Sequence, residues 1–181
     1  MTGGIGKVNE KMLEDFTKIY ETYYTRIYKY TYYRINDEYM AEEVCSRIFE
    51  KILSKYPTFS KNKMSFEAWI FAIARNTVTD YYRAKKRNTH HPLEGLLNKP
   101  STKLTPDQHM IKKEESAYLL EALKQLKEKE RGILSLKYGA ELKHKEIAKI
   151  MGISESNVGV MVYRSLKKLE KILVAGGFKY E

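Results

Sequence analysis

The sequence is poor in residues that build covalent or metal centres. Its 181 residues include one cysteine, Cys45, so no disulfide can form within the chain and cysteine-rich zinc sites are excluded. The four histidines are scattered, with no carboxylate or cysteine at ligand spacing. Glycine-rich phosphate loops and nucleophile motifs are also missing. We therefore expect a chain that is not an enzyme and that uses no metal or other cofactor.

Long apolar runs are missing as well. No stretch approaches the roughly 18 apolar residues of a membrane span, and residues 1–14 lack the apolar segment of a secretory signal. Hydrophobic residues still make up 43% of the chain, enough to bury a core. These features predict a soluble, cytoplasmic protein without direct membrane insertion.

Only four prolines occur, and three of them, Pro92, Pro100 and Pro106, fall in residues 89–112, where no hydrophobic period is sustained. Proline removes a backbone donor and disfavours helix before it. This pattern predicts a linker at 89–112 between domains at 1–88 and 113–181. Fully extended, 24 residues span up to ~80 Å.

Basic residues are in clear excess. Thirty-three Lys and Arg against 23 Asp and Glu give a net charge of +10. Residues 1–88 contribute 16 basic and 11 acidic side chains (+5), and residues 113–181 contribute 14 and 10 (+4). The excess favours a polyanionic partner, above all nucleic acid, and both domains are expected to touch it.

Residues 1–88 show helical periods throughout. The first apolar stripe consists of Phe16, Ile19, Tyr20, Tyr23, Tyr24, Ile27 and Thr31, and Asn36-Asp37 ends it. The second consists of Ala41, Val44, Cys45, Ile48, Phe49, Ile52 and Leu53, and Tyr56-Pro57 ends it. Ser65 is a good N-cap for a third helix that ends in the basic run 83–87. We expect Cys45 to be inert packing.

Residues 143–158 have the spacing of a helix-turn-helix. Ala148 is small where two helices would cross, Gly152 suits the tight turn, and Ser154 would cap a second helix running to about Leu173. That helix is the one expected to enter the DNA major groove. The expected buried positions are Ile147, Ile153, Val158 and Val162.

Two motif sets carry a family resemblance. Residues 66–83 (FEAWIFAIARNTVTDYYR), preceded by AEEVCSRIF at 41–49, resemble region two of bacterial sigma-70-type factors of the extracytoplasmic-function (ECF) subfamily. Residues 123–138, followed by the helix-turn-helix, resemble region four. The resemblance implies an all-α fold of two small helical domains, region two and a region-four helix-turn-helix, joined by a flexible linker.

The resemblance also implies a transcription initiation factor. Its partners would be core RNA polymerase, through the clamp coiled coil of the largest subunit and the flap, promoter DNA, and an anti-sigma factor. The first domain would capture the single-stranded minus-ten element and the second would read the duplex minus-thirty-five element. Proteins hold flipped or unstacked bases with aromatic and polar side chains, and they hold the phosphate backbone of the nucleic acid with cationic side chains.

Candidates for the minus-ten contacts are Arg75, Asn76, Asp80, Tyr81, Tyr82, Arg83, Lys85, Lys86 and Arg87. Candidates for the minus-thirty-five contacts are Ser154, Ser156, Asn157, Val160, Tyr163, Arg164, Lys167 and Lys168. Candidates for docking on core polymerase are Glu42, Glu43, Arg47, Phe49 and Glu50. Asp80 is interpreted as an acceptor for a base donor, because phosphate would repel it.

Two questions stay open at this stage. Family members often carry a Lys-Ser-Arg-like stretch where this chain has Gly159-Val160-Met161, so Gly159 either permits close approach to DNA or weakens the recognition helix. The alternative function is a stand-alone helix-turn-helix regulator that binds duplex DNA as a dimer. A nucleic-acid-processing enzyme would need a carboxylate or histidine cluster that the sequence does not offer.

Overall fold

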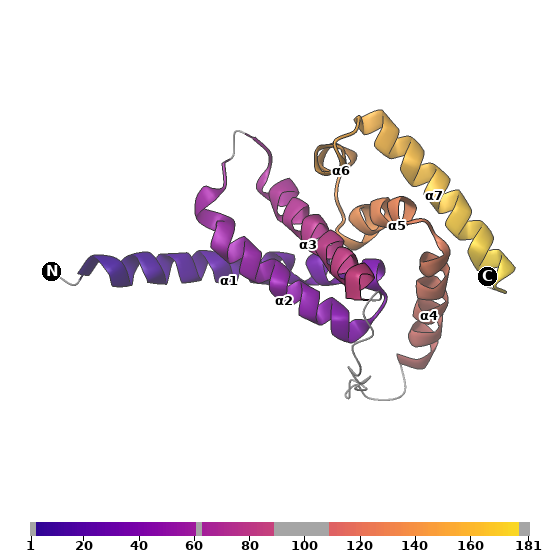
Figure 1. The fold of residues 1–181 in the computed structure, drawn as a ribbon, viewed down its shortest axis with the longest axis horizontal. Helices are drawn as coiled ribbons and strands as arrows, with labels where there is room; N and C mark the ends of the chain where they lie inside the picture. Colours follow the sequence, from indigo (N-terminus) through magenta and orange to yellow (C-terminus); the bar gives the residue numbers. More distant parts are fainter. Residues whose placement is uncertain (1–2, 61–62, 89–108, 178–181) are drawn as a thin grey trace.

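The computed structural model describes the backbone of residues 3–60, 63–88 and 109–177, and the side chains of residues 14–60, 63–87 and 117–177. Within these ranges the regular structure is helical, without strands, which confirms the all-α prediction. We call the first group of helices the front bundle: α1 (Gly3–Ile35), α2 (Glu38–Lys55), the 3-10 turn η1 (Tyr56–Thr58) and α3 (Phe66–Asn88). The back bundle comprises α4 (His109–Gln125), α5 (Glu128–Leu134), the π-turn η2 (Ser135–Gly139), α6 (His144–Met151) and α7 (Glu155–Ala175) (Figure 1).

Local sequence signals set the ends of the front helices. Asn36 takes a left-handed conformation (φ 56°) and ends α1, and the Asp37 carboxylate accepts a hydrogen bond from the Met40 amide at 2.9 Å to start α2. The Ser65 hydroxyl accepts from the Ala68 amide at 3.2 Å and starts α3. These boundaries confirm the turns expected at 36–37 and 65.

The helix-turn-helix is formed by α6 and α7. Gly152 ends α6 at φ 67°, a left-handed conformation that glycine adopts without steric cost because it has no Cβ atom. The Ser154 hydroxyl then caps α7 by accepting from the Asn157 amide at 3.2 Å. Of the expected buried positions, Ile147, Val158 and Val162 are buried, whereas Ile153 is only half-buried.

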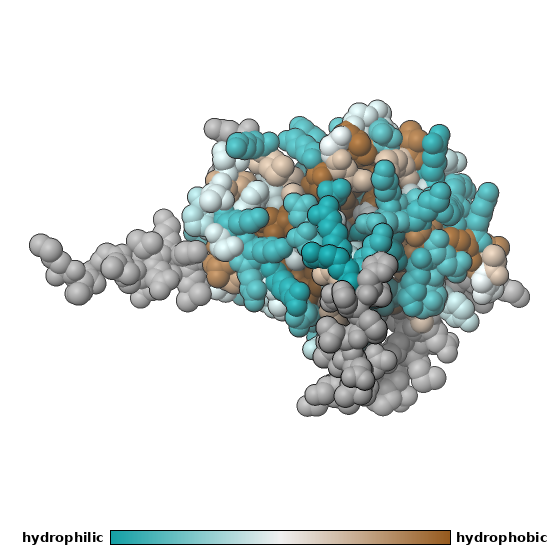
Figure 2. Space-filling view, in the orientation of Figure 1, coloured by the Kyte–Doolittle hydropathy of each residue, from teal (hydrophilic) through white to brown (hydrophobic). Residues whose placement is uncertain are grey.

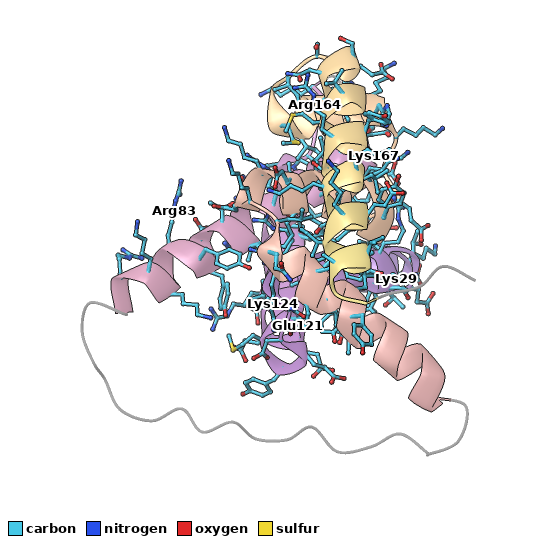
Figure 3. The ribbon with its side chains drawn as sticks, turned by 90° about the vertical axis from the view of Figure 1, so that its right-hand side faces the viewer. Lys29, Arg83, Glu121, Lys124, Arg164 and Lys167 are labelled. Atoms are coloured by element: carbon cyan, nitrogen blue, oxygen red, sulfur yellow. The ribbon has the colours of Figure 1, made fainter. Side chains whose placement is uncertain are left out.

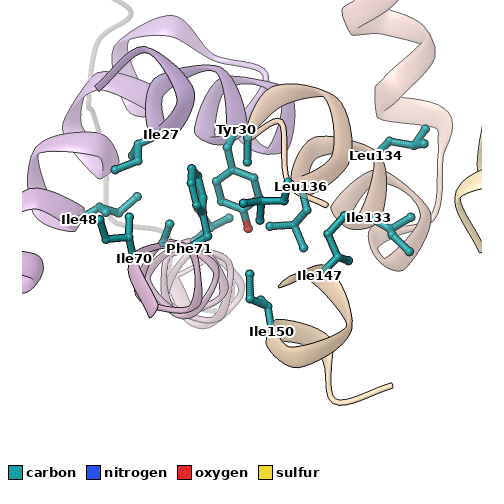
Figure 4. Close-up of a cluster of buried hydrophobic side chains, with 14 of the residues drawn as sticks. Ile27, Tyr30, Ile48, Ile70, Phe71, Ile133, Leu134, Leu136, Ile147 and Ile150 are labelled. Atoms are coloured by element: carbon teal, nitrogen blue, oxygen red, sulfur yellow. The ribbon is translucent and has the colours of Figure 1, made fainter. Parts of the chain in front are cut away.

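A single apolar core runs through both bundles. In Figure 4, Tyr30 and Phe71 of the front bundle lie between Ile27 on one side and Leu136, Ile147 and Ile150 of the back bundle on the other. Tyr30 is 1% exposed and is among the largest fully buried side chains. Across this boundary α1 meets η2 and α5, and α3 meets α6. The described parts of the two domains therefore lie packed together, which the sequence did not predict.

Polar contacts reinforce this packing. The buried Arg34 donates from Nη1 to the Glu128 carbonyl oxygen at 2.9 Å. Asn36 Nδ2 donates to the Leu120 carbonyl at 3.0 Å, and Arg26 Nε to the Ala140 carbonyl at 2.7 Å. Each of these side chains donates to a backbone carbonyl of the other bundle, so buried polar groups on the two sides are paired. Of the linker expected at 89–112, residues 89–108 lie outside the described residues. The remaining four belong to α4, which begins at His109.

Gly139 brings the bundles closest to each other. A Cβ atom at this position would lie 3.0 Å from both N and Cα of Tyr30 in α1, tighter than ordinary van der Waals contact. The missing side chain thus lets η2 rest directly on the α1 backbone.

An aromatic cluster covers the start of α3. The Trp69 ring stacks on Phe66, with centroids 5.5 Å apart and an interplanar angle of 21°. Phe59, just after η1, lies 5.2 Å from Trp69 and 5.0 Å from Phe66. Aromatic pairs at these distances add stability beyond their buried area. The cluster holds the segment just after η1 against the first turns of α3.

Candidate nucleic-acid and polymerase interfaces

The C-terminal half of α3 presents a basic, exposed surface. The side chains of Arg75, Asn76, Asp80 and Arg83 are exposed, as are those of residues 85–87. Hydrophilic residues gather over α2 and α3 in Figure 2, and Arg83 points away from the body of the molecule in Figure 3. The cationic track expected from the sequence is therefore open to solvent.

Beside α3 lies a hollow of about 490 Å³ between this helix and α2. Lys51 and Lys55 of α2 line it together with Arg75, Asn76 and Arg83 of α3. Neither lysine was among the candidate residues selected from the sequence. Their i, i+4 spacing was a usable signal, since it puts both ammonium groups on one face of α2.

Asp80 lies among these cationic side chains. Its carboxylate lies 3.4 Å from Lys51 Nζ and 3.6 Å from an Arg83 guanidinium nitrogen. The sequence interpretation made Asp80 an acceptor for a base donor. In the structure it is instead shared between two cations from two helices.

The two tyrosines of α3 are half-buried rather than open. The Tyr82 hydroxyl donates to the Arg34 carbonyl oxygen, and the Arg34 guanidinium lies 5.7 Å from the Tyr82 ring centroid. Burial raises the pKa of Tyr81 and of Tyr82. In this arrangement Tyr82 belongs to the contact between the bundles, so its face is not available for a base while Arg34 covers it.

Helix α7 offers its outer face to solvent. Val160 is 46% exposed and Tyr163 63% exposed, and Arg164 and Lys167 lie on the visible face of α7 in Figure 3. Ser156 and Asn157 are exposed in the first turn. The structure thus brings most of the minus-thirty-five candidates onto one helix surface.

Four of these candidates also have partners within the protein. Ser154 is the N-cap of α7, and its hydroxyl lies 3.2 Å from the Ser156 hydroxyl. Lys167 Nζ donates to Glu170 at 2.9 Å, and Lys168 Nζ donates to Glu130 of α5 at 2.7 Å. Lys168 is half-buried, so it ties α7 to α5 and is less suited to DNA contact than the sequence indicated.

Packing does not demand the glycine at position 159. A Cβ atom there would meet only the His144 ring at 3.8 Å, an ordinary contact, and Gly159 does not have a positive φ. Packing within the protein therefore does not require glycine at position 159. Any effect of its small size concerns what approaches the surface of α7.

The proposed docking surface of α2 is mostly accessible, with one exception. Glu42, Arg47 and Glu50 are exposed, and Glu43 is half-buried and bonded to Arg47 at 2.8 Å. Phe49 is only 4% exposed. The expectation of a direct Phe49 contact is therefore corrected, because its ring lies inside the front bundle.

Two tyrosines of α1 cover Phe49. Tyr20 and Tyr24 lie with their ring centroids 4.7 and 6.3 Å from that of Phe49, and they are 42% and 36% exposed. Tyr28 continues the row on α1, 6.2 Å from Tyr24. Burial, followed by Glu38 and Glu42, raises the pKa of Tyr28 to about 12, so the Tyr28 hydroxyl stays protonated at neutral pH. The sequence assigned Tyr20 and Tyr24 to the core and missed their exposure.

Other chemical features are few. Cys45 is buried, and burial, with a smaller contribution from Glu42, raises its pKa to about 12, as expected for a packing thiol. Among the described side chains no group of three or more His, Cys, Asp or Glu could hold a metal ion. No helix within the described ranges is long and apolar enough to cross a bilayer.

These features define an all-α DNA-binding protein, with a helix-turn-helix in one bundle and a basic helical surface in the other. Two family profiles match the chain, described as Sigma-70 region 2 over residues 19–88 and Sigma-70, region 4 over residues 116–169. The chain belongs to the sigma-70 family, in its ECF subfamily.

Curated relatives agree with this assignment. The chain is 27% identical over 158 residues to the ECF RNA polymerase sigma factor BldN of Streptomyces coelicolor, covering 87% of this chain and 60% of BldN. It is 27% identical over 165 residues to the ECF RNA polymerase sigma factor SigX of Bacillus subtilis, covering 88% of this chain and 84% of SigX.

Solved structures share the fold. The sigma factor RpoE, in complex with the anti-sigma factor NepR from Bartonella quintana, matches with a TM-score of 0.64 at 19% identity, covering 88% of this chain and 97% of RpoE. CnrH, in complex with the cytosolic domain of CnrY, matches with a TM-score of 0.66 at 19% identity, covering 90% of each chain. At this identity the likeness supports the fold alone.

Proposed function

We propose that this chain binds core RNA polymerase and directs it to specific promoters. The observation that carries the proposal is the presence, in one chain, of a region-2 match ending in the basic helix α3 and a region-4 match containing the helix-turn-helix. Each alone would fit a simpler DNA-binding protein. Together they combine a domain that binds single-stranded DNA with a domain that binds duplex DNA. When two weakly binding domains are linked, the affinity depends on the distance between their two DNA sites.

In the proposed division of work, α3 holds the melted minus-ten strand and α7 reads the minus-thirty-five duplex. The exposed cations of α3 suit phosphates, and Asn76 suits a base edge. On α7, Asn157 and Arg164 are the polar side chains best placed for base edges, while the Tyr163 ring suits apolar contact. Catalysis stays with the polymerase, since this role needs no chemical step by the chain.

Docking on core polymerase is assigned to the α1–α2 surface. Glu42, Arg47 and Glu50 provide its charges, and the exposed tyrosines Tyr20 and Tyr24 provide apolar area beside them. Aromatic residues and arginine are the side chains most enriched where protein interfaces are strongest. The clamp coiled coil of the largest subunit is the proposed partner for this surface, and the flap for the back bundle.

An anti-sigma factor is the further partner that we propose. Support comes from the similar sigma factor RpoE, whose solved structure is a complex with the anti-sigma factor NepR. We place the protein in the cytoplasm, where core polymerase is found.

The test is specific transcription in vitro. Purified chain should bind bacterial core polymerase in a pull-down and should cause initiation at discrete start sites on genomic DNA, read by transcript sequencing. The triple variant Arg83→Ala, Lys86→Ala, Arg87→Ala should weaken the promoter complex and lower its log-log salt slope by about 0.7–0.9 per lost phosphate contact. Duplex binding by a dimer without core polymerase, together with no initiation, would instead favour the stand-alone regulator.

A further inference from the structure

The hollow between α2 and α3 holds more positive charge than the protein neutralises. Its lining includes the cations Lys51, Lys55, Arg75 and Arg83, and a single carboxylate, Asp80. Among the described side chains, Asp80 forms ion pairs with Lys51 and Arg83. No ion pair joins Lys55 or Arg75 to a carboxylate there. Four cations around one anion create a site that attracts a further anion.

Asp80 holds its two partners loosely. The distances of 3.4 Å to Lys51 and 3.6 Å to Arg83 exceed the 2.7–2.9 Å of a tight charge-assisted hydrogen bond. The less exposed pair of Arg26 and Glu67 is shorter, at 2.6 Å. The Asp80 side chain is also 56% exposed. Exposed ion pairs of this kind are weak, so an incoming anion can replace the carboxylate.

The hollow continues along α3. A second depression of about 620 Å³ is lined by Asp80, Arg83, Lys86 and Arg87. Asp80 and Arg83 border both depressions, so Asp80 lies midway along one basic track. An extended chain of phosphates fits such a track better than a single small anion does, because its charges repeat along the backbone.

We propose that Asp80 is a resident counter-anion, which a phosphate of single-stranded nucleic acid displaces when it binds between α2 and α3. Lys51 and Lys55 of α2 then share the phosphates with Arg75 and Arg83 of α3. The strand is held by both helices rather than by α3 alone. The inference rests on the proposed function for its ligand, and it replaces the interpretation of Asp80 as a base acceptor.

The test measures binding of the full chain, without polymerase, to a fluorescent single-stranded DNA of mixed sequence. Asp80→Asn removes the counter-anion and should tighten binding about three- to tenfold, since each exposed ion pair is worth up to a few-fold in an equilibrium constant. The matched control is Glu121→Gln, which removes a carboxylate from another i, i+3 pair, with Lys124 on α4 (Figure 3). It should leave the affinity unchanged.

The lysines of α2 provide the second arm. Lys51→Gln and Lys55→Gln should each weaken binding and lower the log-log salt slope by about 0.7, while Lys124→Gln should change neither. Circular dichroism of each variant checks that the helices are retained. Unchanged affinity in Asp80→Asn would overturn the inference. Weaker binding in that variant would overturn it in favour of base recognition by Asp80.

The outcomes also separate this inference from the proposed function. Suppose that wild type initiates transcription with core polymerase but Asp80→Asn does not bind DNA more tightly. The proposed counter-anion role of Asp80 is then refuted, and the initiation role stands. If Asp80→Asn binds more tightly but wild type never initiates with core polymerase, the groove stands as a nucleic-acid site and the initiation role fails.

Discussion

Arg34 should contribute strongly to holding the two bundles together, and replacing it with alanine measures how much. The side chain is 6% exposed, donates to the Glu128 carbonyl and lies against the Tyr82 ring. A buried hydrogen bond from a charged donor contributes about 1.5–3 kcal/mol, and the ring contact about 0.5–1 kcal/mol. The buried Arg34 Nε atom has no partner, which offsets about 1 kcal/mol. The net loss in Arg34→Ala is therefore about 2 kcal/mol, or roughly 30-fold in the ratio of packed to separated bundles.

The assay is small-angle X-ray scattering combined with chemical denaturation. Arg34→Ala should have a larger radius of gyration than wild type, or a lower midpoint if the bundles unfold together, with helical content retained at low denaturant. Lys29→Ala is the control, because Lys29 also bridges the bundles, to Glu141 at 3.9 Å, but is 47% exposed. It should lose no more than about 0.5 kcal/mol. Equal effects of the two substitutions would refute the reasoning.

Three more predictions concern single positions. Gly159→Ala should raise the free energy of unfolding by about 0.5–1 kcal/mol, since helix propensity improves without crowding; a lower melting temperature would contradict this. Phe49→Asp should unfold the front bundle in circular dichroism, because a buried ring is replaced by an unpaired charge, whereas Glu50→Lys should keep the fold and lower only the affinity for core polymerase. The hydrogen bond from Lys168, opposed by a smaller effect of burial, lowers the pKa of Glu130 below its ordinary 4.5. The ionised pair therefore stabilises the fold above that pH and loses its contribution as the pH falls through the lowered pKa. Wild type should exceed Glu130→Gln by up to about 1 kcal/mol at pH 7, and denaturation series at pH 7 and pH 3 should show the gap closing; a constant gap would be inconsistent with the pair.

Local signals predicted the local structure well. Asp37, Ser65 and Ser154 were readable as helix starts because their side chains can accept from the next free amides. Gly152 was readable as a turn because the position needs a positive φ. Each of these effects acts over a few neighbouring residues, so the sequence alone contains it.

The packing of the bundles depends on contacts far apart in the chain. Ile27 and Thr31 of the stripe predicted on α1 are joined in the structure by Tyr30 and Arg34, spaced i, i+3, i+4 and i+7, and all four are buried. The prediction did not extend to Arg34, because a charged residue usually marks a solvent face. Arg34 is buried because the α5 carbonyl of Glu128 satisfies it. Nothing within α1 indicates that partner.

The same limit applies to the candidate site. The sequence patterns selected the cations of α3, but they did not indicate the ion pairs of Asp80 or the tyrosines that cover Phe49. Both features depend on what the neighbouring helix supplies: Lys51 from α2 in one case, Tyr20 from α1 in the other. Residue type and spacing choose the helix face, and tertiary packing decides which atoms on it remain accessible.

Trp69 gives the protein an intrinsic optical probe. It is the single tryptophan of the sequence, and its ring rests on Phe66 and Phe59 where the chain enters α3. Indole emission changes wavelength and intensity with its surroundings, so excitation of this one ring reports on the start of α3 without any attached dye. A titration that shifts the emission identifies a ligand that rearranges this end of the helix, and a titration that leaves it constant places the rearrangement elsewhere.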